Sequence, residues 1–239
     1  MGSSRFPGKP LADICGRPMI EHVYRRSALS GRLDQLVVAT PDREIAEAVR
    51  GFGGEAMMTS SAHKRATDRV AEAAETTGGD VVIVIQGDEP LIHPEMIGAA
   101  LEPVVEDDSV FCSNLIGPIR SVEEYENPNT IKVVMGANRD ALYFSRSPIP
   151  GIGPDGFDAA PLYRQVCIIP FRRENLGRFI ELEPTPLERL ESVDMLRALE
   201  HGLKVRLVET PFRTLSVDEP EEIAAVEEAM GADPISTRY

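Results

Sequence analysis

The stretch Asp80-Val-Val-Ile-Val-Ile-Gln-Gly-Asp-Glu-Pro90 combines the strongest strand signal in the chain with a polar turn directly after it. A continuous run of β-branched residues is typical of a strand buried on both faces, as in a parallel sheet. Ligands of open α/β sheets bind beyond the carboxyl ends of the strands, so Asp88 is a candidate magnesium ligand, with Gly87 leaving room for a substrate. Because Gly, Asp and Pro are also ordinary turn residues, a plain turn stays an equal alternative from these residues alone.

Strands and helices alternate on both sides of this stretch. Apolar runs indicate strands at 35–39, 55–58 and 110–116, and helical spacing indicates helices at 18–30, 43–52, 66–76 and 94–105. This alternation predicts an α/β fold with a largely parallel central sheet.

The pattern changes after residue 116. Residues 130–135 and 141–145 are typical of two strands that could pair as a hairpin, and the Pro- and Gly-rich residues 147–161 indicate a loop or arm. We further expect a strand over 164–171, helices over 173–179 and 186–200, a strand over 204–208, a helix over 220–230 and a tail over 231–239. The expectation is one domain over residues 1–239, with a hairpin and arm at about 120–165.

The composition excludes several classes of function. The 239 residues carry a formal net charge of −14 and no run rich in Lys or Arg, which argues against nucleic-acid binding. Cys15, Cys112 and Cys167 are far apart, so neither a zinc site nor a disulfide framework is expected. No run reaches the ~18 apolar residues of a membrane span, and no signal peptide precedes the chain. We expect a soluble, cytoplasmic protein without membrane or nucleic-acid partners.

The first ten residues, Met1-Gly-Ser-Ser-Arg-Phe-Pro-Gly-Lys-Pro10, hold two glycines, two hydroxyls and two cations. Backbone N–H groups beside glycine, with the charges of Arg5 and Lys9, suit a polyphosphate. A phosphate-binding loop is therefore one interpretation, and a frayed terminus is the other. The stretch is not a P-loop, because its glycine spacing differs and Pro10 stands where a magnesium-binding hydroxyl is required.

Two further polar stretches contain candidate site residues. Ala62–Arg69 gathers cations and the hydroxyl of Thr67 at the start of an expected helix, where an anion is favoured; an exposed basic helix face is the alternative. Val217–Pro220 is typical of a helix cap, and Asp218 could equally supply a second carboxylate to a metal.

Taken together, these stretches resemble one family along nearly the whole chain. In chain order, the segments that carry the resemblance are Ser4–Leu11, Gly16–Ile20, Val38–Thr40, Thr67–Arg69, Gln86–Pro90, Asn127–Asn129, Ile131–Val134, Ala141–Arg146, Pro184–Glu188 and Val217–Pro220. The chain thereby resembles the 3-deoxy-manno-octulosonate cytidylyltransferases (CMP-Kdo synthetases), within the CMP-sugar-acid synthetases.

The resemblance implies a Rossmann-like nucleotidyltransferase of lipopolysaccharide biosynthesis that couples CTP to a 2-keto-3-deoxy sugar acid. It implies a requirement for Mg²⁺, attack of the anomeric hydroxyl on the α-phosphate with release of pyrophosphate, and a homodimer formed through the hairpin and arm. Arg5, Lys9 and Asp88 would act on the reacting phosphates. The other implied roles are nucleotide contacts at Thr67, Arg69 and Gly87, metal ligands at Asp88 and Asp218, and acceptor contacts at Gln86, Arg146, Arg164, Gln165 and Asp194.

The chain departs from the family pattern in three places. The family has a strand and an Ile-Pro-Ala-Arg-type segment before the glycine loop; this sequence begins inside that loop, so we expect that strand and one Arg to be absent. In the acceptor half, Gln165 and Ile169 stand where the family has His and Tyr, and Asp194-Met195 stands where it has Glu-Gln. Arg65 adds a cation to the family's Ser-Gly-Thr.

The changes in the acceptor half leave alternatives open. Loss of the polar Tyr and Gln indicates an acceptor smaller or less hydroxylated than the octulosonate, because partners for the sugar hydroxyls are removed. One alternative is a cytidylyltransferase for another acid, such as a different nonulosonate or a phosphonate. The other is an inactive homologue that acts as a binding partner.

Overall fold

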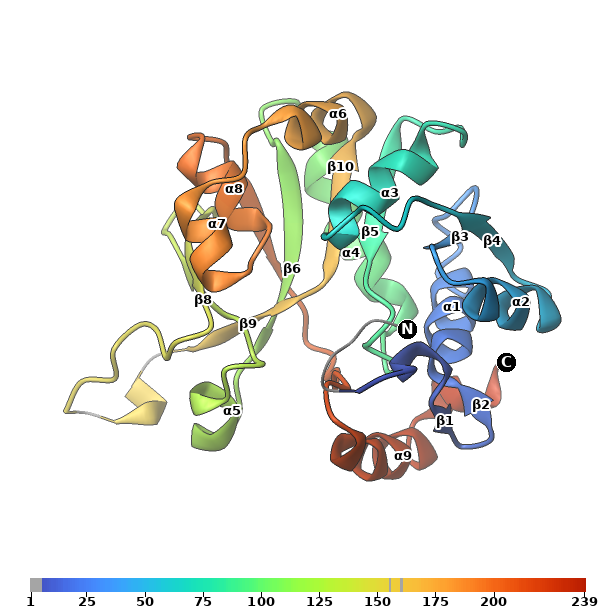
Figure 1. Ribbon diagram of the computed structural model, residues 1–239. Helices are drawn as coiled ribbons and strands as arrows, with labels where there is room; N and C mark the ends of the chain where they lie inside the picture. The colour runs from blue at the N-terminus through green and yellow to red at the C-terminus, as the bar shows by residue number, and fades with distance from the viewer. Residues whose placement is uncertain (1–5, 155, 160) are drawn as a thin grey trace. The chain divides into compact units, whose positions relative to one another are not determined.

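The computed structural model describes residues 6–154, 156–159 and 161–239, and the chain divides into two compact units (Figure 1). The first unit comprises the residues up to Gly79, Gln86–Gly98 and Arg213–Tyr239, and the second comprises Asp80–Ile85 and Ala99–Phe212. The chain crosses from one unit to the other after Gly79, Ile85, Gly98 and Phe212. The expectation of a single domain over residues 1–239 stays a prediction.

The first unit is built from short elements at both ends of the chain. Its helices and strands are η1 Lys9–Leu11, β1 Asp13–Ile14, β2 Arg17–Pro18, α1 Met19–Ala28, β3 Val37–Thr40, α2 Arg43–Gly51, β4 Glu55–Met58, α3 Ala66–Ala74, η3 Pro220–Glu222, α9 Ile223–Gly231 and η4 Pro234–Thr237. β1 and β2 pair antiparallel, and β3 and β4 pair parallel. The helices expected at 18–30, 43–52 and 66–76 and the strand at 55–58 are thus confirmed to within a few residues.

A hydrophobic cluster joins the two ends of the chain in this unit. Ile14 and Met19 pack with Leu91, which follows the polar turn, and with Val226 and Met230 of α9. All five side chains are buried. Because burial of one such side chain is worth ~1.5–3 kcal/mol, this cluster holds α9 and the turn after residue 85 against α1.

Residues 231–239, expected to be a tail, form a packed end instead. The fully buried Arg26 of α1 donates from Nη1 to Asp233 Oδ2 (2.6 Å), from Nη2 to Ser236 Oγ (2.9 Å) and from Nε to the Tyr239 hydroxyl (3.0 Å). The Tyr239 hydroxyl also lies 2.8 Å from Nδ1 of His22. A buried guanidinium needs such partners, and here the final residues supply them.

The second unit contains a seven-stranded sheet. Its elements are β5 Val81–Ile85, β6 Cys112–Pro118, α5 Val122–Glu126, β7 Lys132–Met135, β8 Ala141–Ser145, η2 Phe157–Ala159, β9 Tyr163–Val166, β10 Ile168–Arg172, α6 Arg173–Glu181, α7 Pro186–Glu191, α8 Met195–Glu200 and β11 Val205–Glu209. α4 Pro94–Glu106 begins within the first unit's range and ends within the second's. The strand order is β5–β10–β6–β9–β7–β8, with β11 paired to β6.

The expectation of a largely parallel central sheet is wrong for this sheet. Only β11 pairs parallel to its neighbour; the other described pairs are antiparallel. β5, β6 and β11 do run in one direction, because β10 is antiparallel to both β5 and β6. The alternation of strands and helices therefore predicted that β5, β6 and β11 share one direction. However, β10 lies between β5 and β6, so each of these two strands pairs antiparallel with β10.

Two expected elements are each divided in the structure. The expected strand over 164–171 is two strands, β9 and β10, separated at Cys167, and β10 also pairs with β5. The expected helix over 186–200 is two helices, because Ser192 takes a left-handed conformation (φ 56°) after α7. α5, in contrast, was not expected at all.

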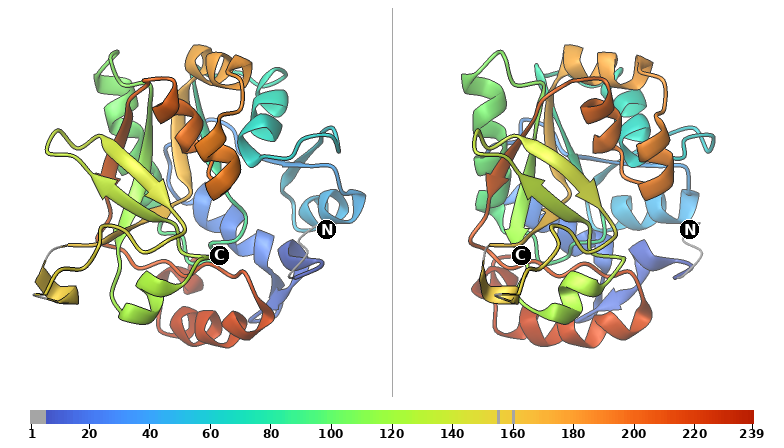
Figure 2. Two further views of the ribbon diagram at one scale, coloured as in Figure 1. Left: turned by 60° about the vertical axis from the view of Figure 1, so that its left-hand side comes forward. Right: turned by 90° about the vertical axis from the view of Figure 1, so that its left-hand side faces the viewer.

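The expected hairpin at 130–145 is confirmed: β7 and β8 pair antiparallel (Figure 2). In the described part of the chain, no helix is long and apolar enough to cross a membrane.

The packed C-terminal end predicts a specific loss of stability. Arg26→Met leaves the Asp233 carboxylate without its guanidinium partner, so we expect the free energy of unfolding to fall by about 3 kcal/mol in urea titrations. Arg25→Met is the matched control on the same helix, because the Arg25 side chain is 35% exposed and pairs with Glu21. We expect it to cost less than about 1 kcal/mol. Equal losses in the two variants would show that Arg26 does not hold the C-terminal end.

Candidate functional site

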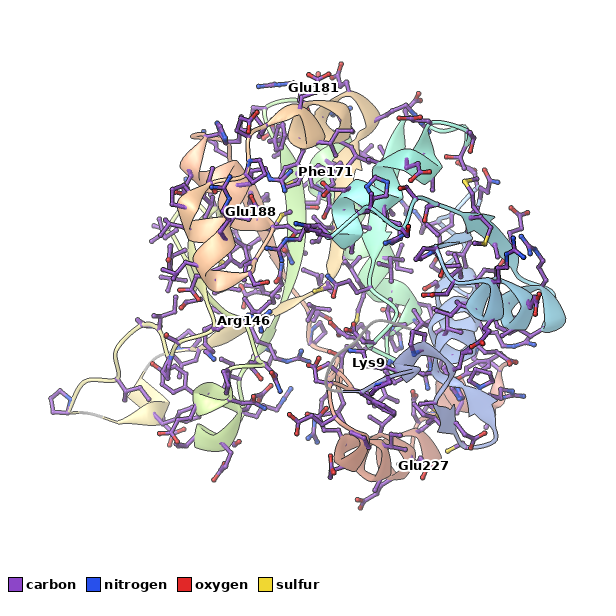
Figure 3. All side chains as sticks on the ribbon, in the orientation of Figure 1. Lys9, Arg146, Phe171, Glu181, Glu188 and Glu227 are labelled. Atoms are coloured by element: carbon purple, nitrogen blue, oxygen red, sulfur yellow. The ribbon has the colours of Figure 1, made fainter. Side chains whose placement is uncertain are left out.

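The glycine loop ends in a short turn that points a cation at two carboxylates. Gly8 has a φ of 77°, a left-handed conformation that suits glycine, and it begins the 3₁₀ turn η1 that carries Lys9 (Figure 3). Lys9 Nζ lies 3.1 Å from Asp88 Oδ2 and 3.4 Å from Asp218 Oδ1. The structure therefore brings three predicted site residues together. Arg5, the other predicted phosphate ligand, lies outside the described residues.

The backbone holds the two carboxylates close. The N–H of Val217 donates to the carbonyl of Asp88 (2.9 Å), so the stretches that carry Asp88 and Asp218 are joined beside the side chains. The expected cap at Asp218 is made instead by Glu219, which forms a capping box with Glu222. The Asp218 carboxylate contacts Lys9.

Electrostatics favour a charged Lys9 in this place. Burial acts to lower the pKa of Lys9, but the Coulomb attraction and hydrogen bonds of the two aspartates outweigh it, and the pKa lies above its usual value. The side chain is 14% exposed. The ammonium is thus a cation fixed between two acidic groups.

Gly87 lets its backbone pack closely against Ile20 of α1. A Cβ atom at this position would lie 2.9 Å from Cδ1 of Ile20 on α1, closer than real Cβ atoms approach a neighbour. The glycine lets the turn after residue 85 approach α1. Its expected role of leaving room for a substrate stays a prediction, as does the substrate contact of the half-buried Gln86.

The two carboxylates fit a magnesium ion whose remaining coordination positions are filled by water and phosphates. No group of three or more His, Cys, Asp or Glu that could hold a metal occurs among the residues described. Two carboxylates around one ammonium nevertheless form a place where a cation is already stabilised. Mg²⁺ is usually bound by one or two carboxylates, with water and substrate phosphates completing its octahedron. Asp88 and Asp218 match that pattern.

Arg69 shapes the basic loop before α3. Its Nη1 donates to Thr59 Oγ1 (2.7 Å) and to the carbonyl of Ser60 (3.0 Å), and its Nη2 donates to the carbonyl of His63 (3.2 Å). The predicted nucleotide contact is therefore a residue that holds a loop in this structure. Thr67, the other predicted nucleotide contact, is buried in the first turn of α3.

Glu72 holds the same loop from α3, and no sequence pattern singles it out. It accepts from the N–H of Ser60 (2.9 Å) and contacts His63 Nε2. The hydrogen bond from Ser60 is the main cause of its lowered pKa.

In the second unit, Arg146 follows β8 and is held by α7 (Figure 3). Its N–H donates to Glu191 Oε2 (2.9 Å), and its Nε donates to the Glu191 carbonyl (2.8 Å). Its Nη1 donates to the carbonyl of Pro128 (3.0 Å). Within the described part of the chain, Nη2 has no hydrogen-bond partner, so one edge of this guanidinium can bind a carboxylate.

Arg164 and Gln165, both predicted acceptor contacts, lie on opposite faces of β9, because successive residues of a strand alternate. Arg164 pairs through Nε with Glu124 Oε1 (3.1 Å). Gln165 donates from Nε2 to Oδ1 of the fully buried Asn114 (2.6 Å). The structure therefore does not bring these two side chains to a single face.

The remaining positions of the expected acceptor pocket include two core residues. Ile169 is buried opposite Val84 of β5, and Met195 is fully buried at the start of α8. Asp194 is the half-buried N-cap residue of α8. Ile169 and Met195 are explained by packing, so their apolar character no longer requires a smaller acceptor.

Sequence reasoning missed Glu191 and Lys132, which organise the surroundings of Arg146. Lys132 is fully buried and donates to three carbonyls. A lone Lys at the start of the apolar run Lys132–Met135 was the available signal, whereas Glu191 had none.

Comparisons with known proteins show the family to which the whole chain is similar. A family model described as Cytidylyltransferase matches residues 1–206. The chain is 47% identical to a 3-deoxy-manno-octulosonate cytidylyltransferase of Syntrophobacter fumaroxidans, over 98% of this chain and 94% of that protein. It is 44% identical to the protein of the same name from Geobacter metallireducens, over 95% of this chain and 93% of that protein. A solved CMP:2-keto-3-deoxy-manno-octonic acid synthetase complexed with CTP superposes with a TM-score of 0.87 at 38% identity, covering 97% of this chain and 95% of the other.

The Arg69 contacts predict a loop that opens when they are lost. Arg69→Met removes three hydrogen bonds to residues 59–63, so we expect trypsin to cleave after Lys64 or Arg65 about tenfold faster, as ~1.4 kcal/mol less local stability would give. Mass spectrometry of timed digests measures these cuts. Arg50→Met, which loses one exposed bond to Ala56, is the control and should leave the rate unchanged. An unchanged rate in Arg69→Met would mean that Arg69 does not hold the loop.

Proposed function

The chain belongs to the cytidylyltransferase family of the CMP-Kdo synthetases, and from that premise we propose that it couples CTP to 3-deoxy-manno-octulosonate, releasing pyrophosphate. The near-full-length match to curated octulosonate cytidylyltransferases carries this proposal. These relatives favour the octulosonate over another acid. The product is the CMP-sugar used in lipopolysaccharide biosynthesis, and the cytoplasm is the expected compartment.

The first unit contains the residues proposed to bind the nucleotide. Lys9 is a cation on a glycine-containing turn, as expected for a residue that binds the triphosphate of CTP. The loop held by Arg69 and Glu72 is the proposed nucleotide-binding segment, with Thr67 at the start of α3. A solved relative is complexed with CTP, which supports CTP as the nucleotide.

Mg²⁺ is the proposed cofactor, with Asp88 and Asp218 as its protein ligands. The ion would neutralise charge on the phosphates and orient them. Lys9 already occupies the place between the carboxylates, so it is expected to turn toward the phosphates when a metal–nucleotide complex binds.

The second unit supplies candidates for the acceptor. Arg146 offers the edge at Nη2 to the carboxylate of the sugar acid, and Arg164 is a second cation. Gln86, Gln165 and Asp194 are proposed to contact the sugar.

The proposed reaction needs no protein nucleophile. A bond forms between the anomeric hydroxyl oxygen of the acid and the α-phosphorus, while the bond from that phosphorus to the bridging oxygen breaks and pyrophosphate leaves. The hydroxyl proton passes to solvent. Lys9 stabilises the charge that gathers on the leaving phosphates, and the arginines hold the acid in line.

A homodimer formed through the β7–β8 hairpin and the arm is the proposed assembly. Leu142 of β8 is 62% exposed, and Val122 and Ile152 are also exposed apolar residues of this region. Their burial against a second copy would remove apolar surface from water.

The activity has a direct test. Purified protein with CTP, Mg²⁺ and the octulosonate should release pyrophosphate, and Asp88→Asn or Asp218→Asn should lower kcat by about a hundredfold or more, the effect of losing one electrostatic contact to the reacting group. Asp108→Asn is the control, because the Asp108 side chain is 96% exposed. Release with another acid but not with the octulosonate would overturn the acceptor. No release with any acid would favour an inactive homologue.

The position of Lys9 predicts how the protein responds to magnesium without nucleotide. Lys9→Met leaves two carboxylates with no cation between them, so Mg²⁺ alone should raise the Tm of the variant by about 2–4 °C more than that of the unmodified protein. Lys204→Met, a change at an exposed lysine, should show no such gain. Equal shifts in all three proteins would contradict a cation site at Asp88 and Asp218.

A further inference from the structure

Lys132 is a buried cation that the proposed reaction does not use. Its side chain lies at the start of β7, is fully buried, and has each of its three N–H donors on a backbone carbonyl. Nζ lies 2.8 Å from the oxygen of Asn127, 2.6 Å from that of Thr130 and 2.6 Å from that of Arg146. The ammonium therefore fastens the turn at 127–130 to the residue that follows β8.

Both of these segments hold Arg146. The turn supplies the Pro128 carbonyl that accepts from Nη1 of Arg146, and Lys132 binds the Arg146 carbonyl directly. Glu191 of α7 holds the same arginine through its N–H and Nε. Lys132 and Glu191 of α7 thus both hold Arg146 through hydrogen bonds, Lys132 at its carbonyl and Glu191 at its N–H and Nε.

The sheet register places Lys132 in a row with the other arginine of the proposed acceptor site. Lys132 is the cross-strand partner of Ser145 on β8 and of Arg164 on β9. Directly opposite residues of paired strands share one face of the sheet. The row Ser145–Lys132–Arg164 therefore connects the strand end that carries Arg146 to Arg164.

Three cations gather in this group, Lys132, Arg146 and Arg164. Among the described residues, Glu191 on α7 and Glu124 on α5 are carboxylates that contact them. In a chain of net charge −14, such a local gathering of cations favours an anion only where it is held in place.

We propose that Lys132 is the positioning residue of the acceptor site, holding Arg146 and the 127–130 turn so that the Nη2 edge of Arg146 meets the carboxylate of the sugar acid. This inference rests on the proposed function. Lys132 acts through Arg146 and contacts no substrate itself.

The protonation of Lys132 provides a readout that a purely structural residue would not show. Burial, and to a smaller extent the positive charge of Arg146, lower the pKa of Lys132 to about 8, while Glu191 opposes the change. Below that pH the ammonium has three N–H donors for three carbonyls; above it the neutral amine has two. One carbonyl then loses its donor and one positive charge beside Arg146 is lost, so binding of the acid weakens as the pH rises through 8.

The test compares Lys132→Met with the unmodified protein in steady-state kinetics. We expect the KM for the octulosonate to rise about 10- to 100-fold, as loss of a charged hydrogen-bonding group gives, while the KM for CTP changes less than about twofold. Arg206→Met is the matched control, because it removes a cation paired with Asp140 on the β7–β8 turn and should lower the Tm without raising the KM for the acid. In the unmodified protein the KM for the acid should rise above pH 8, and in Lys132→Met that rise should be absent.

The outcomes separate the inference from the function on which it rests. Turnover of CTP and the octulosonate with an unchanged KM for the acid in Lys132→Met overturns the inference alone. If Lys132→Met does not fold, the pH profile of the unmodified protein decides, and a KM that stays flat from pH 7 to pH 9 overturns it. If the unmodified protein releases no pyrophosphate from CTP and the octulosonate, the proposed function fails.

Discussion

A cation taken out of water must recover its lost hydration from fixed acceptors, and this constraint shapes both units of the protein. In the first unit, Arg26 is fully buried, and its donors define where the C-terminal residues pack. In the second, Arg197 and Glu188 are both buried and share two hydrogen bonds of 2.8 and 2.6 Å, which join α8 to α7 (Figure 3). Lys132 meets the same requirement with three carbonyls. Arg26 connects segments that are distant in the chain, Arg197 connects two consecutive helices, and Lys132 connects a turn to the end of β8.

The same constraint explains why a cation lies in the candidate site. Asp88 and Asp218 are brought close by a backbone hydrogen bond between their segments, and two adjacent carboxylates repel unless a positive charge lies between them. Lys9 fills that role in the structure. In the proposed reaction a metal ion would take over the neutralisation of the carboxylates, and the flexible ammonium would turn to a phosphate.

The interleaving of strands has a consequence for the acceptor half. β10 lies between β5 and β6, so Ile169 faces Val84 and becomes a core residue of the sheet. A break at Cys167 separates β10 from β9, where Arg164 and Gln165 lie on opposite faces. Local sequence cannot distinguish core residues from pocket residues here, since each position is one residue of an apolar or mixed strand. The resemblance alone made all of them appear to be pocket residues.

The sequence by itself determined the order and approximate bounds of most of the longer helices and strands, the β7–β8 hairpin and the segments that carry the family resemblance, because periodicity, turn residues and motif spacing are local properties. It also predicted Lys9, Asp88 and Asp218 as site residues, with Lys9 as a phosphate ligand and the two aspartates as metal ligands. Only the tertiary structure decided that Lys9 lies between the two carboxylates, that β10 separates β5 from β6, and that Lys132 holds Arg146. These are contacts between residues up to 209 positions apart in the chain. Which distant segments meet depends on how the whole core closes and on which buried charges find partners, and no local pattern records that.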